Sequence, residues 1–430
     1  RPKAGVFAVR QTPFLAHNLR AHLQGEKLKE YIPQRGFLSM LSLGQQEAVA
    51  EKHPFHASGR WVWKWKKAID TRFMKQFEDI PAEMPAAEPS EAEMHCGGCG
   101  AKLPGENLRA VLADLSQQFP KVVDAGTLGD DASAIEVSGP ATFLQSVDVL
   151  RQFVDDPWLM GRISLLHAIS DLHAMGTRPT SVLSHVCLPY ASRHLQMADL
   201  NAILAGACAE LEREGATLIG GHTIEGPELS VGFTVNGLAA NDILSKSNVK
   251  AGDRLILCKP LGTGVLFAAQ QLGVARGDWI SAALENMLLS NLGAALVAQD
   301  HGLGAATDVT GFGLLGHLAE MIAEAPLAAR ITVAAVPVLK GVSSCYEQGV
   351  SSSLQPGNKA LVAPMIPGNQ LLQSPECEVL FDPQTSGGLL LAVPPVLVDA
   401  VLGDLVEAGY QNAAVIGELE AAETGCFIFD

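Results

Sequence analysis

Residues Ala306–His317, with the sequence ATDVTGFGLLGH, combine a short apolar run, an aspartate and a glycine-rich turn. The glycines and leucines after Asp308 predict that this turn opens directly into a helix over 314–323. A carboxylate beside the N–H groups of a helix start is suited to Mg²⁺ and phosphate together. An aspartate that only caps the helix explains the same pattern. Both interpretations make the stretch a strand–turn–helix unit of an α/β protein.

Predicted strands and helices alternate with short glycine-rich turns on both sides of this stretch. The fold class is therefore α/β (α+β), with a two-domain body that divides near residue 250 into 95–250 and 251–430. The predicted strands cover residues 141–149, 181–188, 229–238, 254–258, 388–393 and 414–416. The predicted helices cover residues 157–175, 196–214, 281–298, 314–323 and 396–408.

The first 80 residues differ from this body in charge. Residues 1–80 carry 14 Lys/Arg and 7 Asp/Glu, whereas the remainder carries 16 Lys/Arg and 39 Asp/Glu. Residues 81–94, PAEMPAAEPSEAEM, have few large apolar groups, so they are predicted to form a linker. The chain therefore consists of a small basic appendage, a linker and an acidic body.

Local patterns predict several elements in the appendage: a strand end at 5–7, a helix over 13–24 and a strand over 36–43. Residues 60–67, RWVWKWKK, hold three of the five tryptophans. This basic aromatic stretch fits a helix docked on a partner domain, with its lysine stems lying along apolar surface. Binding at a membrane interface is the alternative.

The composition excludes several classes of protein. With 48% hydrophobic and 18% charged residues, a chain of 430 residues is a globular protein of two to three domains. No apolar run is long enough to predict a transmembrane helix, and the net charge of −16 disfavours nucleic acid as a partner. The eight cysteines are scattered except for Cys96 and Cys99, which indicates a reducing, cytoplasmic location.

One candidate nucleophile lies just after the linker, in the segment Met94–Lys102 (MHCGGCGAK). Cys99 stands three residues before Lys102, and a nearby ammonium group lowers the pKa of a thiol and makes it nucleophilic. An inert exposed thiol is the alternative. A zinc site is not supported, because no second CxxC or HxxxH supplies the missing ligands.

Several aspartates stand at predicted turns, strand ends or inside an apolar helix. They are Asp130 and Asp131 after Gly129, Asp148 at a strand end, Asp171 in a helix, and Asp308. Each has a solvated or capping alternative when taken singly. Together, without a P-loop or a GxGxxG motif, they fit a divalent-metal phosphoryl-transfer site.

Two glycine pairs, Gly220–Gly221 and Gly387–Gly388, stand at further predicted turns. Gly220–Gly221 is predicted to end a strand in a turn whose N–H groups cradle phosphate, or in a turn without a ligand. The polar turn before Leu389 is predicted to be structural.

Seven segments in this order resemble the selenophosphate synthetase (selenide, water dikinase) family. They are Cys99–Lys102, Asp130–Asp131, His167–Asp171, Gly220–Thr223, Lys259–Gly264, Thr307–His317 and Asp382–Gly388. The resemblance runs from about residue 94 to residue 430. It implies an aminoimidazole ribonucleotide synthetase-like body that forms a homodimer and completes an ATP site across two subunits. It also implies conversion of ATP, selenide and water to selenophosphate, AMP and phosphate, with Mg²⁺ and K⁺.

The resemblance also implies residue roles. Cys99 takes the position of the catalytic cysteine or selenocysteine, and Lys102 approaches the ATP phosphates. The expected magnesium ligands are Asp131, Asp171 and Asp308. The expected nucleotide contacts are Leu128, Gly129, Asp130, Asp148 and Asp171, with Gly221, His222 and Thr223 reaching the ATP of a partner subunit. This chain has His167 where the family commonly has Asn, and the role of Cys96 is open.

Residues 1–80 carry a different resemblance. The stretch Ala4–Leu19 is similar to the C-terminal part of type II NADH dehydrogenase-like flavin oxidoreductases, in which a strand ending Gly-Val-Phe-Ala leads into a helix. The usual Gly-Asp and both dinucleotide-binding halves are missing, so about 80 residues are not expected to bind FAD or NADH alone. The resemblance implies a fused or partner flavin oxidoreductase domain.

Three other interpretations stay open from the sequence. The first is an ATP-dependent kinase or ligase of the same superfamily with another acceptor. The second is a flavin oxidoreductase subunit or membrane-docked module that uses residues 1–80. The third is a non-catalytic ATP-binding scaffold.

Overall fold

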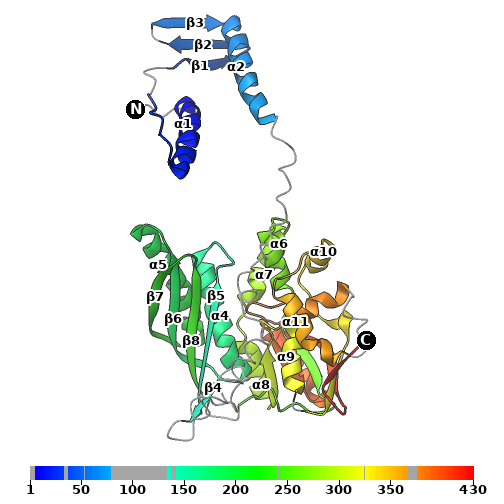
Figure 1. Ribbon diagram of the computed structural model, residues 1–430. Coiled ribbons are helices and arrows are strands. Elements are labelled where there is room, and N and C mark those ends of the chain that lie inside the picture. The colour runs from blue at the N-terminus through cyan, green and yellow to red at the C-terminus, as the bar shows by residue number, and fades with distance from the viewer. Residues whose placement is uncertain are drawn as a thin grey trace. The chain divides into compact units, whose positions relative to one another are not determined.

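The computed structural model describes residues 5–32, 37–52, 54–78, 133–136, 142–239, 243–323, 325–366 and 375–430. The chain forms two compact units, Arg1–Ala92 and Glu93–Asp430 (Figure 1). The predicted linker at 81–94 lies outside the described residues. So do Cys96, Cys99, Lys102 and the stretch Leu128–Asp131.

The N-terminal unit contains two helices and an antiparallel sheet in the order β1-β2-β3. Its elements are α1 (Gly5–Gln24), β1 (Ser39–Gly44), β2 (Glu47–Lys52), β3 (Phe55–Gly59) and α2 (Arg60–Glu78). Its small core consists of Ala48, Ala50 and Val62. The strand predicted at 36–43 and the helix at the basic aromatic stretch are confirmed.

The strand end predicted at 5–7 is wrong, because Gly5–Phe7 belongs to helix α1. A three-residue apolar run needs a neighbouring strand to satisfy its backbone groups. The three-stranded sheet of this unit does not include the run. Helical hydrogen bonds within the segment satisfy those groups instead, and the helix continues through Pro13.

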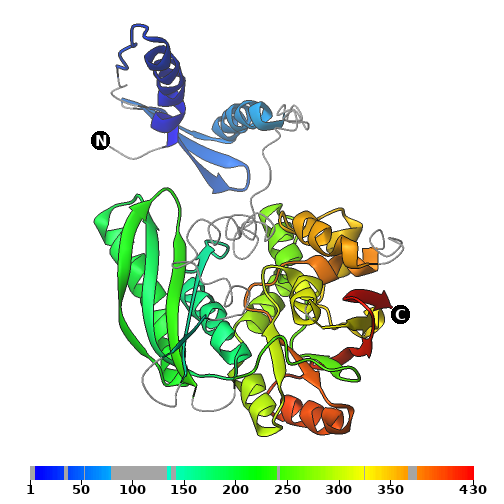
Figure 2. The same cartoon turned by 60° about the horizontal axis from the view of Figure 1, so that its bottom comes forward.

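The first half of the larger unit is a five-stranded mixed sheet in the order β4-β5-β8-β6-β7. Its strands are β4 (Ser133–Glu136), β5 (Thr142–Arg151), β6 (Pro179–Pro189), β7 (Thr217–Gly226) and β8 (Ser230–Ala239). Helices α4 (Pro157–Ala174) and α5 (Arg193–Glu214) pack beside this sheet (Figures 1 and 2). The strands and helices predicted over residues 141–149, 157–175, 181–188, 196–214 and 229–238 are confirmed to within a few residues.

Helices α4 and α5 approach so closely that glycines are required on both sides. A Cβ atom on Gly161 would lie 2.0 Å from the carbonyl oxygen of Ile203, and one on Gly206 would lie 2.2 Å from that of Trp158. Close packing leaves α4 almost fully buried, including the polar side chains of Ser164, His167, Ser170 and His173. Buried polar groups need partners, so α4 is where the structure concentrates its polar contacts.

The second half is a six-stranded mixed sheet in the order β10-β12-β9-β13-β11-β14. Its strands are β9 (Arg254–Leu257), β10 (Ala305–Asp308), β11 (Leu327–Ile331), β12 (Leu389–Val393), β13 (Ala414–Ala421) and β14 (Cys426–Phe429). Its helices are α6 (Thr263–Gln271), α7 (Gly277–Met287), α8 (Leu292–Asp300), α9 (Gly313–Ile322), α10 (Val342–Glu347), α11 (Gln355–Val362) and α12 (Val398–Glu407). At one side of this sheet, the edge strand β10 and its neighbours β12 and β9 are almost wholly buried.

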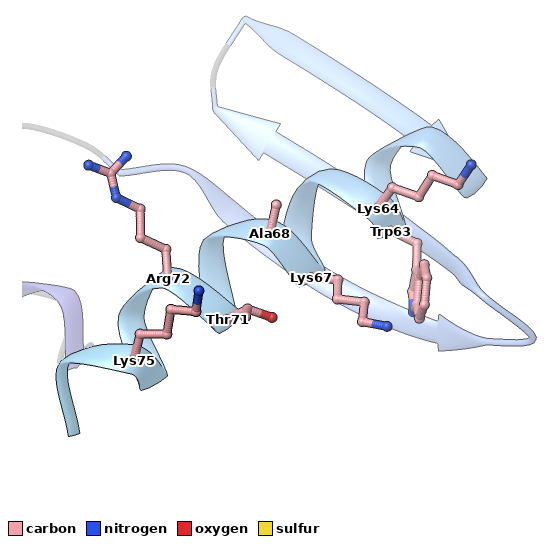
Figure 3. A pocket seen from close by; sticks show the side chains of 7 residues that line it. All are labelled: Trp63, Lys64, Lys67, Ala68, Thr71, Arg72 and Lys75. Atoms are coloured by element: carbon pink, nitrogen blue, oxygen red, sulfur yellow. The ribbon is translucent and has the colours of Figure 1, made fainter. Parts of the chain in front are cut away.

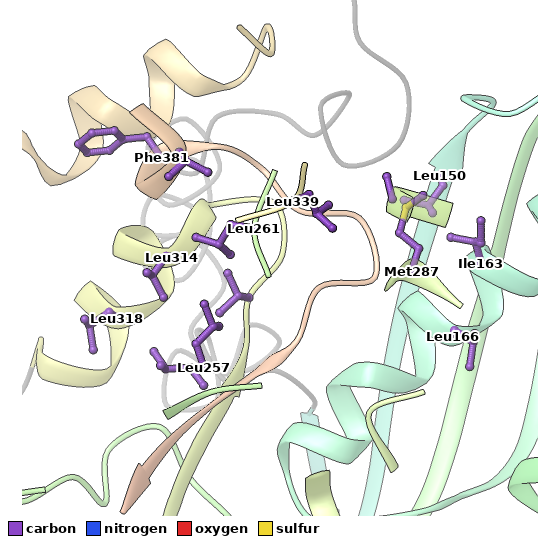
Figure 4. Packing of buried hydrophobic residues seen from close by; sticks show 14 of the residues in the cluster. Leu150, Ile163, Leu166, Leu257, Leu261, Met287, Leu314, Leu318, Leu339 and Phe381 are labelled. Atoms are coloured by element: carbon purple, nitrogen blue, oxygen red, sulfur yellow. The ribbon is translucent and has the colours of Figure 1, made fainter. Parts of the chain in front are cut away.

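One hydrophobic cluster joins the two halves. It contains Leu150 and Ile163 from the first half and Leu257, Met287 and others from the second (Figure 4). Because burial of apolar area stabilises by roughly 25 cal/mol per Å², a continuous core holds the halves together as one body. The polar contacts between α4 and the second half lie within this shared core.

The single helix predicted over 281–298 is wrong in its continuity. The structure breaks it between Met287 and Leu292 into α7 and α8, bent by 46°. The residues of the break use their backbone carbonyls elsewhere: Lys259 Nζ donates to Leu289 O, and the Tyr410 hydroxyl donates to Ser290 O. Among the described residues, no single helix is long and apolar enough to cross a bilayer, and this bent pair passes that test only jointly.

Candidate functional site

One turn of helix α4 carries three polar side chains that reach three different elements. Ser146 of β5 donates a hydrogen bond to Asp171 Oδ2. The hydroxyl of Ser170 donates to Asp308 Oδ2 at the end of β10, at 2.7 Å. His167 contacts both the first half and the second. Helix α4 therefore carries one predicted metal ligand, Asp171, and holds a second, Asp308, through the hydrogen bond from Ser170.

Asp308 lies in a buried polar cluster with Ser170 and Asn291. Asp308 is 1% exposed, and its Oδ1 atom has no hydrogen-bond partner within the described part of the chain. Asn291, just before helix α8, donates through Nδ2 to Ser170 Oγ and to Gly387 O, both at 2.8 Å. Neither Ser170 nor Asn291 is a sequence-predicted site residue, because only folding places them beside Asp308.

His167 is fully buried and bridges the two halves. The backbone N–H of Ser386 donates to His167 Nδ1 at 3.3 Å, which leaves the other ring nitrogen to carry the proton. That nitrogen, Nε2, lies 3.6 Å from Asp148 Oδ2. Asp148 sits inside strand β5 rather than at its end, since the strand continues to Arg151. His167 thus orients toward a predicted nucleotide contact.

Lys259 holds the turn before β12 in place. It is 1% exposed, and its Nζ donates to Leu289 O and to Ser386 O at 2.5 and 3.1 Å. Burial lowers the pKa of Lys259 to about 7, and the nearby Cys258 and Asp308 oppose that shift. Ser386 has a φ of +50°, a strained value for a residue with a side chain. The lysine is a buried tether for this turn.

The turn before β12 also closes over the start of helix α6. Gln384 Oε1 accepts from the backbone N–H groups of Gly262 and Thr263, at 2.9 and 3.2 Å. Its Nε2 donates to Asp382 Oδ2 at 2.9 Å. Burial raises the pKa of Asp382 to about 7, while the backbone N–H groups of Gly264 and Val265 oppose that rise. The turn is structural, as the sequence predicts, and it fills the anion-binding end of α6.

The turn predicted at Gly220–Gly221 is wrong, because both glycines lie inside the continuous strand β7. A Cβ atom on Gly221 would lie 2.3 Å from the carbonyl oxygen of Ser184 on β6. The glycine therefore permits close pairing of parallel strands instead of forming a phosphate cradle. Gly221, His222 and Thr223 are exposed at the end of the described sheet, and their predicted contact with a partner's ATP stays a prediction.

The predicted metal ligands do not form a complete cluster within the described residues. No group of three or more His, Cys, Asp or Glu side chains there is arranged to hold a metal ion. Asp131, the third predicted ligand, lies outside the described residues. The carboxylate of Asp308 nevertheless fits a divalent cation, because it presents a buried oxygen without a hydrogen bond, and hard cations prefer such oxygens.

Two family models match the chain. The N-terminal domain of AIR synthase related proteins matches residues 129–239, and the C-terminal domain of the same proteins matches residues 250–428. A relative from Pelobacter propionicus, a selenide, water dikinase, is 36% identical over 75% of this chain and 92% of its own length. The chain belongs to the selenide, water dikinase family. A relative from Myxococcus xanthus with the same name is also 36% identical, over 77% of this chain and 94% of its own length.

Solved structures show the same fold as this selenide, water dikinase family member. Thiamine monophosphate kinase from Aquifex aeolicus matches with a TM-score of 0.54 at 17% identity, over 74% of this chain and 96% of that one. The hydrogenase maturation protein HypE from E. coli matches with a TM-score of 0.52 at 17% identity, over 75% and 93%. The predicted aminoimidazole ribonucleotide synthetase-like body is confirmed.

The N-terminal unit of this selenide, water dikinase family member carries a separate basic groove on helix α2. Trp63, Lys64, Lys67, Ala68, Thr71, Arg72 and Lys75 line a pocket of about 580 Å³ (Figure 3). Lys67 lies over the ring of Trp63 at 5.3 Å, and the rings of Trp61 and Trp65 on the same helix stack on each other and are half exposed. This groove shares no residue with the buried site around α4.

Proposed function

We propose that the protein synthesises selenophosphate from ATP, selenide and water, and releases AMP and phosphate. The observation that carries this function is 36% identity to selenide, water dikinases over more than nine tenths of their length. The buried carboxylate of Asp308 supports it chemically, because phosphoryl transfer depends on cations that neutralise the triphosphate. This assignment favours the selenium branch over the kinases with the same fold.

Each residue of the site is proposed to have its own role. Asp171 and Asp308, with Asp131, are proposed to hold Mg²⁺, which supplies positive charge against the phosphates. Asp148, held near His167, is proposed to contact the nucleotide together with Leu128, Gly129 and Asp130. Cys99 and Lys102 are proposed to act on selenide and the phosphates, and K⁺ is proposed as a second cofactor.

A homodimer is proposed because one face of the first sheet carries several exposed apolar side chains among the described residues. Val147, Val149, Ile224 and Leu238 are each about half exposed on the face of this sheet away from Leu144 and Leu150. A second copy would bury these apolar side chains and bring His222 of β7 to its partner. Light scattering on the purified protein is expected to give the mass of a dimer. A monomer at micromolar concentration would contradict the proposal.

A docking role is proposed for the N-terminal unit, in line with a fused or partner flavin oxidoreductase domain. The observation that favours it is the exposed Trp61 and Trp65 beside the basic groove of α2. The purified chain is expected to lack flavin absorbance and to stay in solution with anionic vesicles. Pelleting with such vesicles would favour the membrane interpretation.

The described cysteines are free thiols, which supports the proposed cytoplasmic location.

The deciding experiment is phosphorus NMR of the protein with ATP, Mg²⁺, K⁺ and selenide under anaerobic conditions. A selenophosphate resonance with an equal amount of AMP, absent without selenide, is the expected result. The variant C99A is expected to lose selenide-dependent turnover. Consumption of ATP that does not depend on selenide would assign the chain to another acceptor in the same superfamily.

A further inference from the structure

Two oxygen atoms in the core of the site lack hydrogen-bond partners among the described residues: Asn291 Oδ1 and Asp308 Oδ1. Their side chains are 3% and 1% exposed. A buried acceptor without a donor is costly, so such atoms are rare in native proteins unless water or an ion satisfies them. The pair therefore points to a bound group.

The orientation of the Asn291 amide is determined by its neighbours. Its Nδ2 donates to the carbonyl oxygen of Gly387 and to the hydroxyl oxygen of Ser170, each at 2.8 Å. A flipped amide would place its oxygen against the Gly387 carbonyl, which cannot donate. Both N–H groups are thus used, and Oδ1 is left as an acceptor that faces no donor.

Ser170 links the two side chains that carry these oxygens. Its hydroxyl accepts from Asn291 and donates to Asp308 Oδ2 at 2.7 Å. These hydrogen bonds run in one direction, so neither Asn291 nor Asp308 can take a proton from the serine for its Oδ1 atom. The nearby ammonium of Lys259 donates to the Leu289 and Ser386 carbonyls, and among the described residues it makes no hydrogen bond to either oxygen.

We propose that Asn291 Oδ1 is a ligand of the divalent cation held by Asp308, so that an amide and a carboxylate bind it together. This step rests on the proposed magnesium site of the synthetase. Carboxylate and amide oxygens are both hard ligands of such cations. A comparison of acidic motifs misses Asn291, because it is neutral and stands alone at the break between α7 and α8.

The test compares N291A with N358A. Asn358 is also 3% exposed, and its Nδ2 also makes two hydrogen bonds, to the backbone carbonyls of Gly311 and Phe381 at 2.9 Å. Each variant loses two buried hydrogen bonds from an amide Nδ2, but of these two asparagines Asn291 is the one with a buried oxygen that has no partner among the described residues. Binding of Mn²⁺ as a probe is measured by electron paramagnetic resonance on the full chain, with and without a non-hydrolysable ATP analogue.

We expect N291A to bind Mn²⁺ about tenfold more weakly than wild type and N358A to bind it like wild type. Equal affinity of all three proteins would overturn the assignment. So would the absence of Mn²⁺ binding to wild type in both conditions. Because no selenide is present, these results are independent of whether the enzyme makes selenophosphate.

The variant N291D covers the case in which N291A does not fold. It keeps an oxygen at the site and adds a buried negative charge beside Asp308, so the cation is expected to raise its melting temperature more than that of wild type. Circular dichroism during heating, with Mn²⁺ and with a chelator, measures this difference. A metal-dependent shift equal to that of wild type would contradict the role of Asn291 as a ligand.

Discussion

The turn after β10 and the turn before β12 each begin with a buried aspartate, yet their surroundings differ. Asp308 accepts from Ser170 through Oδ2, and Ser170 accepts from Asn291. The Oδ1 atoms of Asp308 and Asn291 have no donor among the described residues. Asp382 Oδ1, although also without a hydrogen bond, lies at the start of helix α6, where backbone N–H groups carry positive partial charge. The start of helix α6 compensates the carboxylate of Asp382, whereas we propose that a bound cation compensates the carboxylate of Asp308.

The comparison teaches that burial of an aspartate alone does not identify a ligand site. Burial raises the pKa of Asp382 to about 7, so this carboxyl can be neutral near physiological pH and needs no cation. Its turn is also held by Gln384 and Lys259, both within hydrogen-bond distance of neighbouring backbone groups. The Asp382 turn is a clasp, held by its own contacts, whereas the Asp308 turn is the one proposed to bind a cation.

The largest expected effect comes from D308N. The amide keeps the shape and the hydrogen bond from Ser170 but removes the charge that a divalent cation needs, so selenide-dependent AMP formation is expected to fall by about 100-fold. The matched control is D382N, which makes the same change in the other turn. Activity of D308N within threefold of wild type would remove Asp308 from the metal site.

The next effect concerns the clasp. A Cβ atom in G264A would lie 2.4 Å from the carbonyl oxygen of Pro383 and 2.7 Å from Asp382 Oδ1. The backbone has to move, so the free energy of unfolding is expected to fall by about 2 kcal/mol in urea denaturation. The control is G277A at the start of α7, where no atom lies within 4 Å of the new Cβ. Equal free energies of unfolding for both variants would show that the Asp382 turn does not pack tightly against Gly264.

Substitution of His167 tests whether the Asp382 turn helps to position Asp148, the proposed nucleotide contact. H167A leaves the buried N–H of Ser386 without its acceptor, and kcat/KM for ATP is expected to fall by roughly tenfold. H167N can still accept through its amide oxygen and should restore part of the loss. As a control, H301A removes a more exposed pair with Asp404 and should change little. An unchanged kcat/KM in H167A would show that nucleotide binding at Asp148 does not depend on the Asp382 turn.

The smallest effect is the pH dependence of stability in D382N. The pKa of Asp382 is raised in the folded protein, so the fold holds a proton that the unfolded chain releases. Wild type therefore loses stability from this group as pH rises from about 4 to about 7, and the loss is constant above that range. Subtracting the D382N curve should isolate this slope. A difference that does not change with pH would contradict the raised pKa.

Local sequence signals predicted much of the fold of the larger unit. Strands such as β8 and helices such as α4 follow from the alternation and length of apolar runs. The errors have one cause. The strand end at Gly5–Phe7, the turn at Gly220–Gly221 and the unbroken helix over 281–298 were judged from near neighbours, whereas distant partners decide these backbones.

The sequence by itself determined the family and the order of the motifs, and it singled out Asp171 and Asp308 as candidate metal ligands, because these follow from residue type and spacing. Only the tertiary structure decided which oxygens have no donor. Ser170 meets Asp308 across 138 positions and Asn291 across 121. Whether an oxygen lacks a partner depends on which groups packing has removed from water, and no spacing along the chain contains that information.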